Sequence, residues 1–165
     1  MNMGLVLRTG AAAALGVALC ALVRAPAAAQ WALAPAAAST IPASQLLQPE
    51  QLNLLLHTKG AEKPLVLQVG SHVMFAEAHI AGSEYAGPGS QDAGLQQLRS
   101  RVGPLKRNAF IVIYCGCCPW SHCPNIGPAY KLLHDMGFTR VKALYLADNF
   151  GADWADKGYP VESGR

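Results

Sequence analysis

The segment from Phe110 to Tyr114 constrains the fold of this chain more than any other. All five residues are apolar or aromatic, three are β-branched, and no charged or turn-forming residue interrupts them. A continuous apolar run of this kind is typical of a strand that is buried on both faces of a parallel sheet. We therefore expect a parallel sheet that contains this strand and has helices packed against it.

Helical and extended patterns alternate along the rest of the chain. Apolar residues spaced three and four apart, proline in a first turn and a closing glycine mark the expected helices. We expect, in chain order, a helix from Pro49 to Gly60, a strand at Leu65–Val69, a helical turn at Phe75–His79, a glycine-rich loop at Gly82–Gly94, a short helix at Leu95–Val102, a helix that Asn125 caps and Gly137 ends, and a strand at Val141–Leu146. This alternation predicts an α/β domain with a small parallel sheet flanked by helices.

Residues 1–29 have the pattern of a signal peptide. Arg8 supplies a positive charge, Ala11–Val23 is apolar, and small residues end the segment at Ala29. The apolar run is shorter than the ~20 residues that a membrane-spanning helix needs, which favours cleavage after Ala29 over a permanent anchor. We therefore expect export, to a bacterial periplasm or outside the cell, and no stable membrane span after processing.

The mature chain would consist of an Ala/Pro-rich linker at residues 30–40 and one domain at residues 41–165. Loss of Arg8 and Arg24 lowers the formal net charge from +3 to +1. A nearly neutral domain offers no electrostatic basis for binding nucleic acid, so we expect no such partner. An oxidising compartment would also join neighbouring thiols unless a reductase or a metal intervened.

Four of the five cysteines lie within nine residues, directly after the apolar strand, at Cys115, Cys117, Cys118 and Cys123. Thiols this close together react, bind a soft metal or form disulfides. The spacing leaves these three possibilities open and specifies no disulfide pairing.

Several short motifs follow one another in an order and spacing that are specific when taken together. They are a His-Ile-Ala-Gly-Ser segment at His79–Ser83, a strand that ends in a cysteine at Ile113–Cys115, a Gly-Phe pair at Gly137–Phe138, a strand at Val141–Leu146, Trp154, and a Gly-Tyr-Pro-Val segment at Gly158–Val161. With its flanking elements, this series covers residues 41–162 and resembles the rhodanese (sulfurtransferase) domain. The resemblance implies a three-layer α/β domain with a small parallel sheet between helices.

The resemblance also implies a function. Cys115 stands where that family has its nucleophile, which takes the outer sulfur of a small donor such as thiosulfate as a persulfide. An acceptor thiol, free or on a protein, then removes the sulfur, and no cofactor is required. Because a loop before a helix directs backbone N–H groups at its centre, we expect a lowered pKa for the Cys115 thiol. The substrate loop and auxiliary thiols would be Gly116, Cys117, Cys118, Trp120, Ser121, His122 and Cys123.

The chain departs from the family pattern at three points. Gln68-Val69-Gly70 replaces the usual Asp-x-Arg, Trp120 stands where the loop usually has a basic residue, and the loop after Cys115 is longer than usual. A loop with less positive charge should accept anionic thiosulfate less well. No arginine lies between Cys115 and Ala129, which argues against the related phosphatases, whose loop arginine binds phosphate.

Three other functions remain open from the sequence. A Cu(I) or zinc site would use Cys117, Cys118, His122 and Cys123. Cys115 and Cys118 have the C-x-x-C spacing of thiol–disulfide oxidoreductases, although Pro119 and Pro124 delay the helix that would follow. The missing charged residues also fit a rhodanese-like module without catalysis.

Four aromatic side chains have simpler expected roles. We expect His79 to be a buried, hydrogen-bonded residue at a turn, and Trp154 and Tyr159 to belong to the core. Trp120 is expected to cover the apolar underside of the cysteine loop.

Overall fold

The computed structural model describes Met1 and residues 41–164. Its helices are α1 (Pro49–His57), α2 (His72–Glu77), α3 (Asp92–Val102), α4 (Ile126–Asp135) and α5 (Phe150–Asp153). Its strands are β1 (Leu46–Leu47), β2 (Leu65–Gln68), β3 (His79–Ile80), β4 (Glu84–Tyr85), β5 (Phe110–Tyr114), β6 (Arg140–Leu144) and β7 (Val161–Glu162). Short 3-10 helices form η2 (Ala43–Gln45), η3 (Trp120–His122) and η4 (Ala155–Lys157).

The predicted signal peptide at residues 1–29 and the linker at residues 30–40 lie, apart from Met1, outside the described residues. Within the residues that are described, every helix is too short or too polar to cross a lipid bilayer.

The main sheet has five strands in the order β1-β6-β5-β2-β4, and its neighbouring strands are all parallel. β5 is central, because Ile111 pairs with Leu65 of β2 on one side and with Val141 of β6 on the other. Four of the five β5 residues are buried, which confirms the predicted strand and its parallel sheet. β3 and β7 form a separate antiparallel pair.

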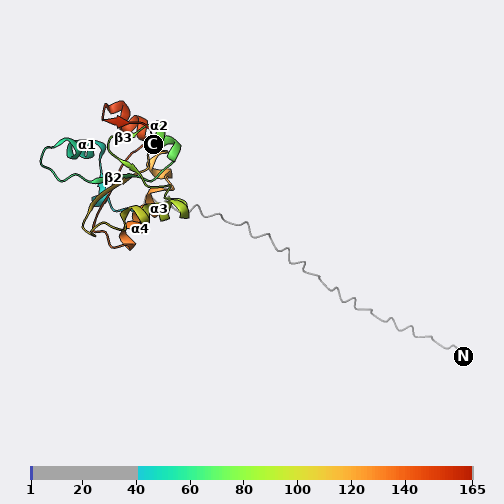
Figure 1. Ribbon diagram of the computed structural model, residues 1–165. Helices are drawn as coiled ribbons and strands as arrows, with labels where there is room; N and C mark the ends of the chain where they lie inside the picture. Colours follow the sequence, from blue (N-terminus) through green and yellow to red (C-terminus); the bar gives the residue numbers. More distant parts are fainter. Residues whose placement is uncertain (2–40, 165) are drawn as a thin grey trace. The chain divides into compact units, whose positions relative to one another are not determined.

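Alternation along β5 divides the core into two layers. Ile111 and Ile113 pack with residues of α3 and α4, whereas Val112 and Tyr114 pack with residues of α1 and α5. Figure 1 shows α3 and α4 together on the lower side of the sheet and α1 on its upper side. A strand covered on both faces must be apolar at every position, which explains why the sequence of β5 does not alternate.

Some element boundaries differ from the sequence predictions. The helical turn predicted at Phe75–His79 is α2, which begins and ends earlier, and the strand predicted at Val141–Leu146 is β6 at Arg140–Leu144. The segment Gly82–Gly94, predicted as loop, contains β4 and the first turn of α3.

Gly94 explains why the sequence analysis predicted loop where α3 begins. A Cβ at this position would lie 2.1 Å from the carbonyl oxygen of Pro88. Glycine lowers helix propensity, but here the close approach of a neighbouring segment requires it inside the helix. Gly94 is therefore explained by tertiary packing and does not mark a loop.

The predicted positions of His79 and Trp154 are confirmed. His79 is buried, and its Nδ1 lies 2.8 Å from the carbonyl oxygen of Phe75. Trp154 is fully buried, and its Nε1 donates to the carbonyl oxygen of Pro160 at 2.9 Å. Tyr159 packs edge-on against Trp154 but is only partly buried, so its predicted core position is confirmed only in part.

Two leucines of α1 provide a test of this packing. Leu52 is 0% exposed between α1 and the sheet, whereas Leu54 is 68% exposed. We expect Leu52→Ala to lower the free energy of unfolding by about 3 kcal/mol, because it removes buried methyl groups and leaves a cavity. Leu54→Ala should change it by less than about 0.5 kcal/mol. Urea denaturation measures both, and equal losses would contradict the described orientation of α1.

Candidate active site

Cys115 follows β5 directly, at the carboxyl edge of the sheet, and Gln68 holds its backbone there. The buried Gln68 side chain donates from Nε2 to the carbonyl oxygen of Cys115 at 3.2 Å and accepts the N–H of Gly70 on Oε1 at 3.1 Å. Gly70 leaves space for the thiol, because a Cβ there would lie 3.0 Å from Cys115 Sγ. Gln68 and Gly70, which stand in place of the Asp and Arg of the resembled family, thus position Cys115.

The loop after Cys115 is hydrogen-bonded to the segment that follows β6. Gly116 has a φ of +75°, and a Cβ there would lie 2.8 Å from Cβ of Phe150. Its carbonyl oxygen accepts the N–H of Phe150 at 3.0 Å. Farther along, the N–H of Trp120 donates to the carbonyl oxygen of Ala147 at 3.1 Å, and its ring packs 5.2 Å from that of Tyr145. Trp120 therefore covers the apolar side of the loop, as predicted.

The loop brings the four cysteine sulfurs into one cluster. Cys115 Sγ lies 3.0 Å from Cys117 Sγ, and Cys117 Sγ lies 3.5 Å from Cys118 Sγ. Cys123 is buried, and its thiol affects the pKa of both Cys115 and Cys117. All four are free thiols. The pair in closest contact is Cys115–Cys117, and not the Cys115–Cys118 pair that the C-x-x-C spacing suggested.

Asn125 is a site residue whose contact with the cysteines was not predicted from the sequence. It precedes α4 as predicted, but its side chain makes no capping hydrogen bond. Instead, the buried Nδ2 donates to Cys115 Sγ at 3.3 Å and lies 3.8 Å from Cys117 Sγ, while Oδ1 accepts the N–H of Ser90 at 3.0 Å. The asparagine sits at a helix start, where capping is its usual role, so no local signal pointed to the thiols.

The hydrogen bonds within the cluster concentrate negative charge on Cys117. Hydrogen bonds from Cys115 and then from Cys123 lower the pKa of Cys117 well below the usual thiol value, and they outweigh its partial burial. The interactions of the Cys115 thiol with Cys117 and then with Cys123 raise the pKa of Cys115, and burial adds to this. Because the sulfurs titrate together, the titration belongs to the cluster as a whole, and its hydrogen bonds favour the negative charge on Cys117.

The other two thiols, Cys118 and Cys123, have raised pKa values. Burial, followed by the hydrogen bond to Cys117, raises the pKa of Cys118 to about 12. For Cys123, the bond to Cys115 lowers the pKa, but Cys117 and burial outweigh it and the net shift is upward. The backbone N–H groups of Asn125 and Ile126 point at Cys123. The lowered pKa predicted for Cys115 is therefore wrong, because its interactions with Cys117 and Cys123 and its burial raise the pKa, and the amides at the start of α4 are directed at Cys123.

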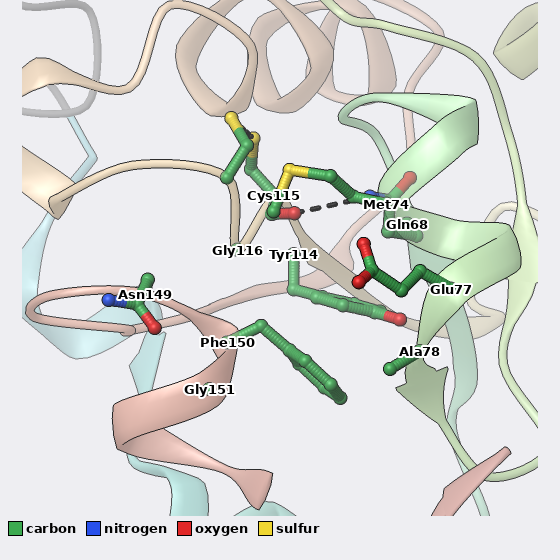
Figure 2. Close-up of a pocket in the computed structure, with 11 residues that line it drawn as sticks. Gln68, Met74, Glu77, Ala78, Tyr114, Cys115, Gly116, Asn149, Phe150 and Gly151 are labelled. Atoms are coloured by element: carbon green, nitrogen blue, oxygen red, sulfur yellow. Dashed lines mark hydrogen bonds between the residues drawn. The ribbon is translucent and has the colours of Figure 1, made fainter. Parts of the chain in front are cut away.

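The cysteines face two different spaces. Cys115 and Cys117 line a cavity of about 350 Å³. Its other walls are Gln68, Met74, Glu77, Ala78, Tyr114, Gly116, Asn149, Phe150 and Gly151. Figure 2 shows the Met74 side chain and the Glu77 carboxylate directed into this cavity beside Cys115. Cys118 and Cys123 line a much smaller space under Trp120 instead. Of the four thiols, only Cys115 and Cys117 thus border the larger cavity.

Ser121 and His122 lie away from this chemistry. Both are exposed, and Ser121 Oγ lies 2.8 Å from Nδ1 of His122. Neither lines the cavities that Cys115 borders. In the part of the chain that is described, no group of three or more His, Cys, Asp or Glu side chains is arranged to hold a metal ion. Binding of Cu(I) or zinc stays a prediction.

Solved structures resemble this arrangement of strands and helices. The BH2092 protein from Bacillus halodurans has a TM-score of 0.56 at 23% identity, over 73% of this chain and 77% of its own. The crystal structure of the Alr3790 protein from Anabaena sp. has a TM-score of 0.55 at 22% identity, over 72% and 92%. The solution structure of the rhodanese-like domain of Alr3790 has a TM-score of 0.54 at 22% identity, over 72% and 79%. The chain has the rhodanese-like fold.

The fold confirms the predicted three-layer class. No protein-family model matches the sequence, and the comparison with curated proteins found no similar sequence. A rhodanese-like fold supports many uses of the same scaffold, so activity has to be argued from the site. Here the distinguishing feature is the Cys115–Cys117 contact beside a cavity.

Proposed function

We propose that this protein is a sulfurtransferase that carries a sulfane sulfur as a persulfide on Cys115. The observation that supports it is the 3.0 Å contact between Cys115 Sγ and Cys117 Sγ at the wall of a 350 Å³ cavity. A thiol beside a base of its own is the arrangement that nucleophilic catalysis needs. The cavity leaves room for the added sulfur and for a small donor or acceptor.

In the loading step, Cys117 acts as the base and Cys115 as the nucleophile. The Cys115 thiol passes its proton to the Cys117 thiolate and attacks the outer sulfur of a donor RS–SH. A bond forms between Cys115 Sγ and that sulfur, the RS–S bond breaks, and RS⁻ leaves with the electron pair. This proton transfer is uphill in pKa, but the two sulfurs share one proton across the 3.0 Å contact, and the Cys115 thiolate is the stronger nucleophile once it forms.

In the unloading step, an acceptor thiolate attacks the outer sulfur of the Cys115 persulfide. The acceptor becomes a persulfide, Cys115 leaves as a thiolate, and the proton held by Cys117 returns to it. Asn125 Nδ2, 3.3 Å from Cys115 Sγ, stabilises the negative charge that develops on this sulfur in both directions.

Intact-mass measurement of reduced protein after incubation with polysulfide tests the proposal. We expect the wild type to gain about 32 Da, the mass of one sulfur atom, and Cys115→Ser to gain none. Cys118→Ser serves as the matched control and should load normally, because Cys118 does not line the cavity. A wild type that gains no sulfur, or equal loading of Cys115→Ser, would contradict the proposal.

The Cys115–Cys117 contact also supports a second candidate, a reversible disulfide between these two thiols. Export to an oxidising compartment, if it occurs, would favour this bond. The same mass measurement separates the two functions, because a disulfide removes about 2 Da and a persulfide adds about 32 Da. A protein that only cycles between the dithiol and the disulfide would be an oxidoreductase.

A further inference from the structure

We infer that the cavity selects thiol partners that carry a positive charge, with Glu77 as the selecting group. This inference rests on the proposed sulfur transfer and names the class of its small-molecule acceptor, an amine-bearing thiol. It is based on the charge, the apolar walls and the volume of the cavity that Cys115 lines.

Glu77 is the single carboxylate among the described residues that line this cavity, and none of them is basic. It ends α2, and Figure 2 shows its carboxylate turned into the cavity. Among the described residues Glu77 forms no salt bridge, whereas Glu62 and Glu84 are paired with arginines. Its negative charge therefore faces the space that a ligand would fill.

The surroundings strengthen the effect of this charge. Met74, Tyr114 and Phe150 supply apolar walls, and a charge beside apolar walls interacts with a ligand more strongly than a charge in open water. The thiolate on Cys117 adds a second negative charge to the same cavity. An anionic partner would therefore meet repulsion from both groups, and a cationic one attraction from both.

The size of the cavity suits a small partner. A volume of about 350 Å³ is at the lower end of the range for small-molecule sites. Since Cys115 and Glu77 both border this space, a short thiol could bring its sulfur to the Cys115 persulfide while its ammonium group faces the carboxylate. Its thiolate would attack the outer sulfur, the Cys115–sulfur bond would break, and Cys115 would leave as a thiolate.

Three acceptors of similar size test the inference, namely cysteamine, 2-mercaptoethanol and 3-mercaptopropionate, which are cationic, neutral and anionic. The rate at which each removes sulfur from the loaded protein is followed by intact mass. Because the three thiols differ in intrinsic reactivity, the informative quantity is the cysteamine-to-mercaptopropionate rate ratio in different variants. We expect Glu77→Gln to lower this ratio about fivefold and Glu77→Lys to lower it further.

Glu50→Gln is the matched control. It removes the same charge from an exposed helix position that does not line the cavity, and it should leave the ratio at the wild-type value. Glu77 is exposed at the end of a short helix, so its replacement should not affect folding. Normal loading with the same rate ratio in Glu77→Gln and wild type would overturn this inference alone. Failure of the wild type to load sulfur would overturn the proposed function as well.

Discussion

Replacing Cys117 by serine should slow sulfur uptake by Cys115 about 100-fold at neutral pH. Cys117 Sγ lies 3.0 Å from Cys115 Sγ and holds the thiolate of the cluster. Serine keeps the size of the side chain but is not a base at this pH, so the Cys115 thiol would have to ionise by itself. Burial opposes that ionisation. Rapid mixing with polysulfide, followed by intact mass, measures the uptake rate.

The same replacement should change how the rate depends on pH. In the wild type the lowered pKa of Cys117 keeps the base ionised through neutral and mildly acidic solution, so the rate should stay nearly constant there. In Cys117→Ser only the ionised fraction of Cys115 reacts, and below its pKa that fraction falls tenfold for each pH unit.

Cys118→Ser provides the matched comparison for this profile. It also removes a thiol from the cluster, but one whose raised pKa leaves it protonated at neutral pH. Its rate should stay within a few-fold of the wild type and remain nearly independent of pH. Parallel pH profiles for Cys117→Ser and the wild type would show that Cys117 is not the base.

Changing Asn125 to aspartate should raise the apparent pKa of the cysteine cluster by about two units. The two side chains have the same shape, and the retained oxygen still accepts the N–H of Ser90. However, the amide that donates to Cys115 Sγ at 3.3 Å becomes a carboxylate oxygen, and it places a negative charge against the thiolate. The ultraviolet absorbance of the thiolate during a pH titration measures this shift.

Asn149→Asp controls for the effect of added charge in the cavity. Asn149 lines the same space, but its side chain accepts the N–H of Ala152 and has no described contact with a cysteine sulfur. Its replacement should shift the thiol titration much less than Asn125→Asp does, because a solvated charge at greater distance is screened. Equal shifts would assign the effect to charge in the cavity in general, and not to the Asn125 contact.

The central strand and the position of Cys115 at its end are the parts that could be predicted from the sequence. β5 is apolar at every position because both of its faces are covered, and this pattern is local. Cys115 could be placed at the end of that strand for the same reason. Gly94 and the start of α3 could not be predicted, because the close approach of Pro88 that requires the glycine involves a different segment.

The roles of the individual cysteines could not be predicted from the sequence either. The spacing left the pairing of the cysteines open and included a C-x-x-C between Cys115 and Cys118, but the fold of the loop puts Cys117 in contact with Cys115, and Cys118 lines a different space. Hydrogen bonds and charge interactions change steeply over fractions of an ångström. Which thiol holds the charge therefore depends on the positions of sulfur atoms and amides that residue order does not specify.

The sequence by itself determined an α/β domain with a buried parallel strand and a cysteine at the carboxyl end of that strand, because both follow from the local apolar pattern and residue order. Tertiary structure alone decided that Asn125 donates to the thiols, that hydrogen bonds lower the pKa of Cys117, and that Glu77 lines the same cavity as Cys115 and Cys117. Those residues come from α2, the cysteine loop and the start of α4, and only the packing of these elements around the sheet edge brings them together.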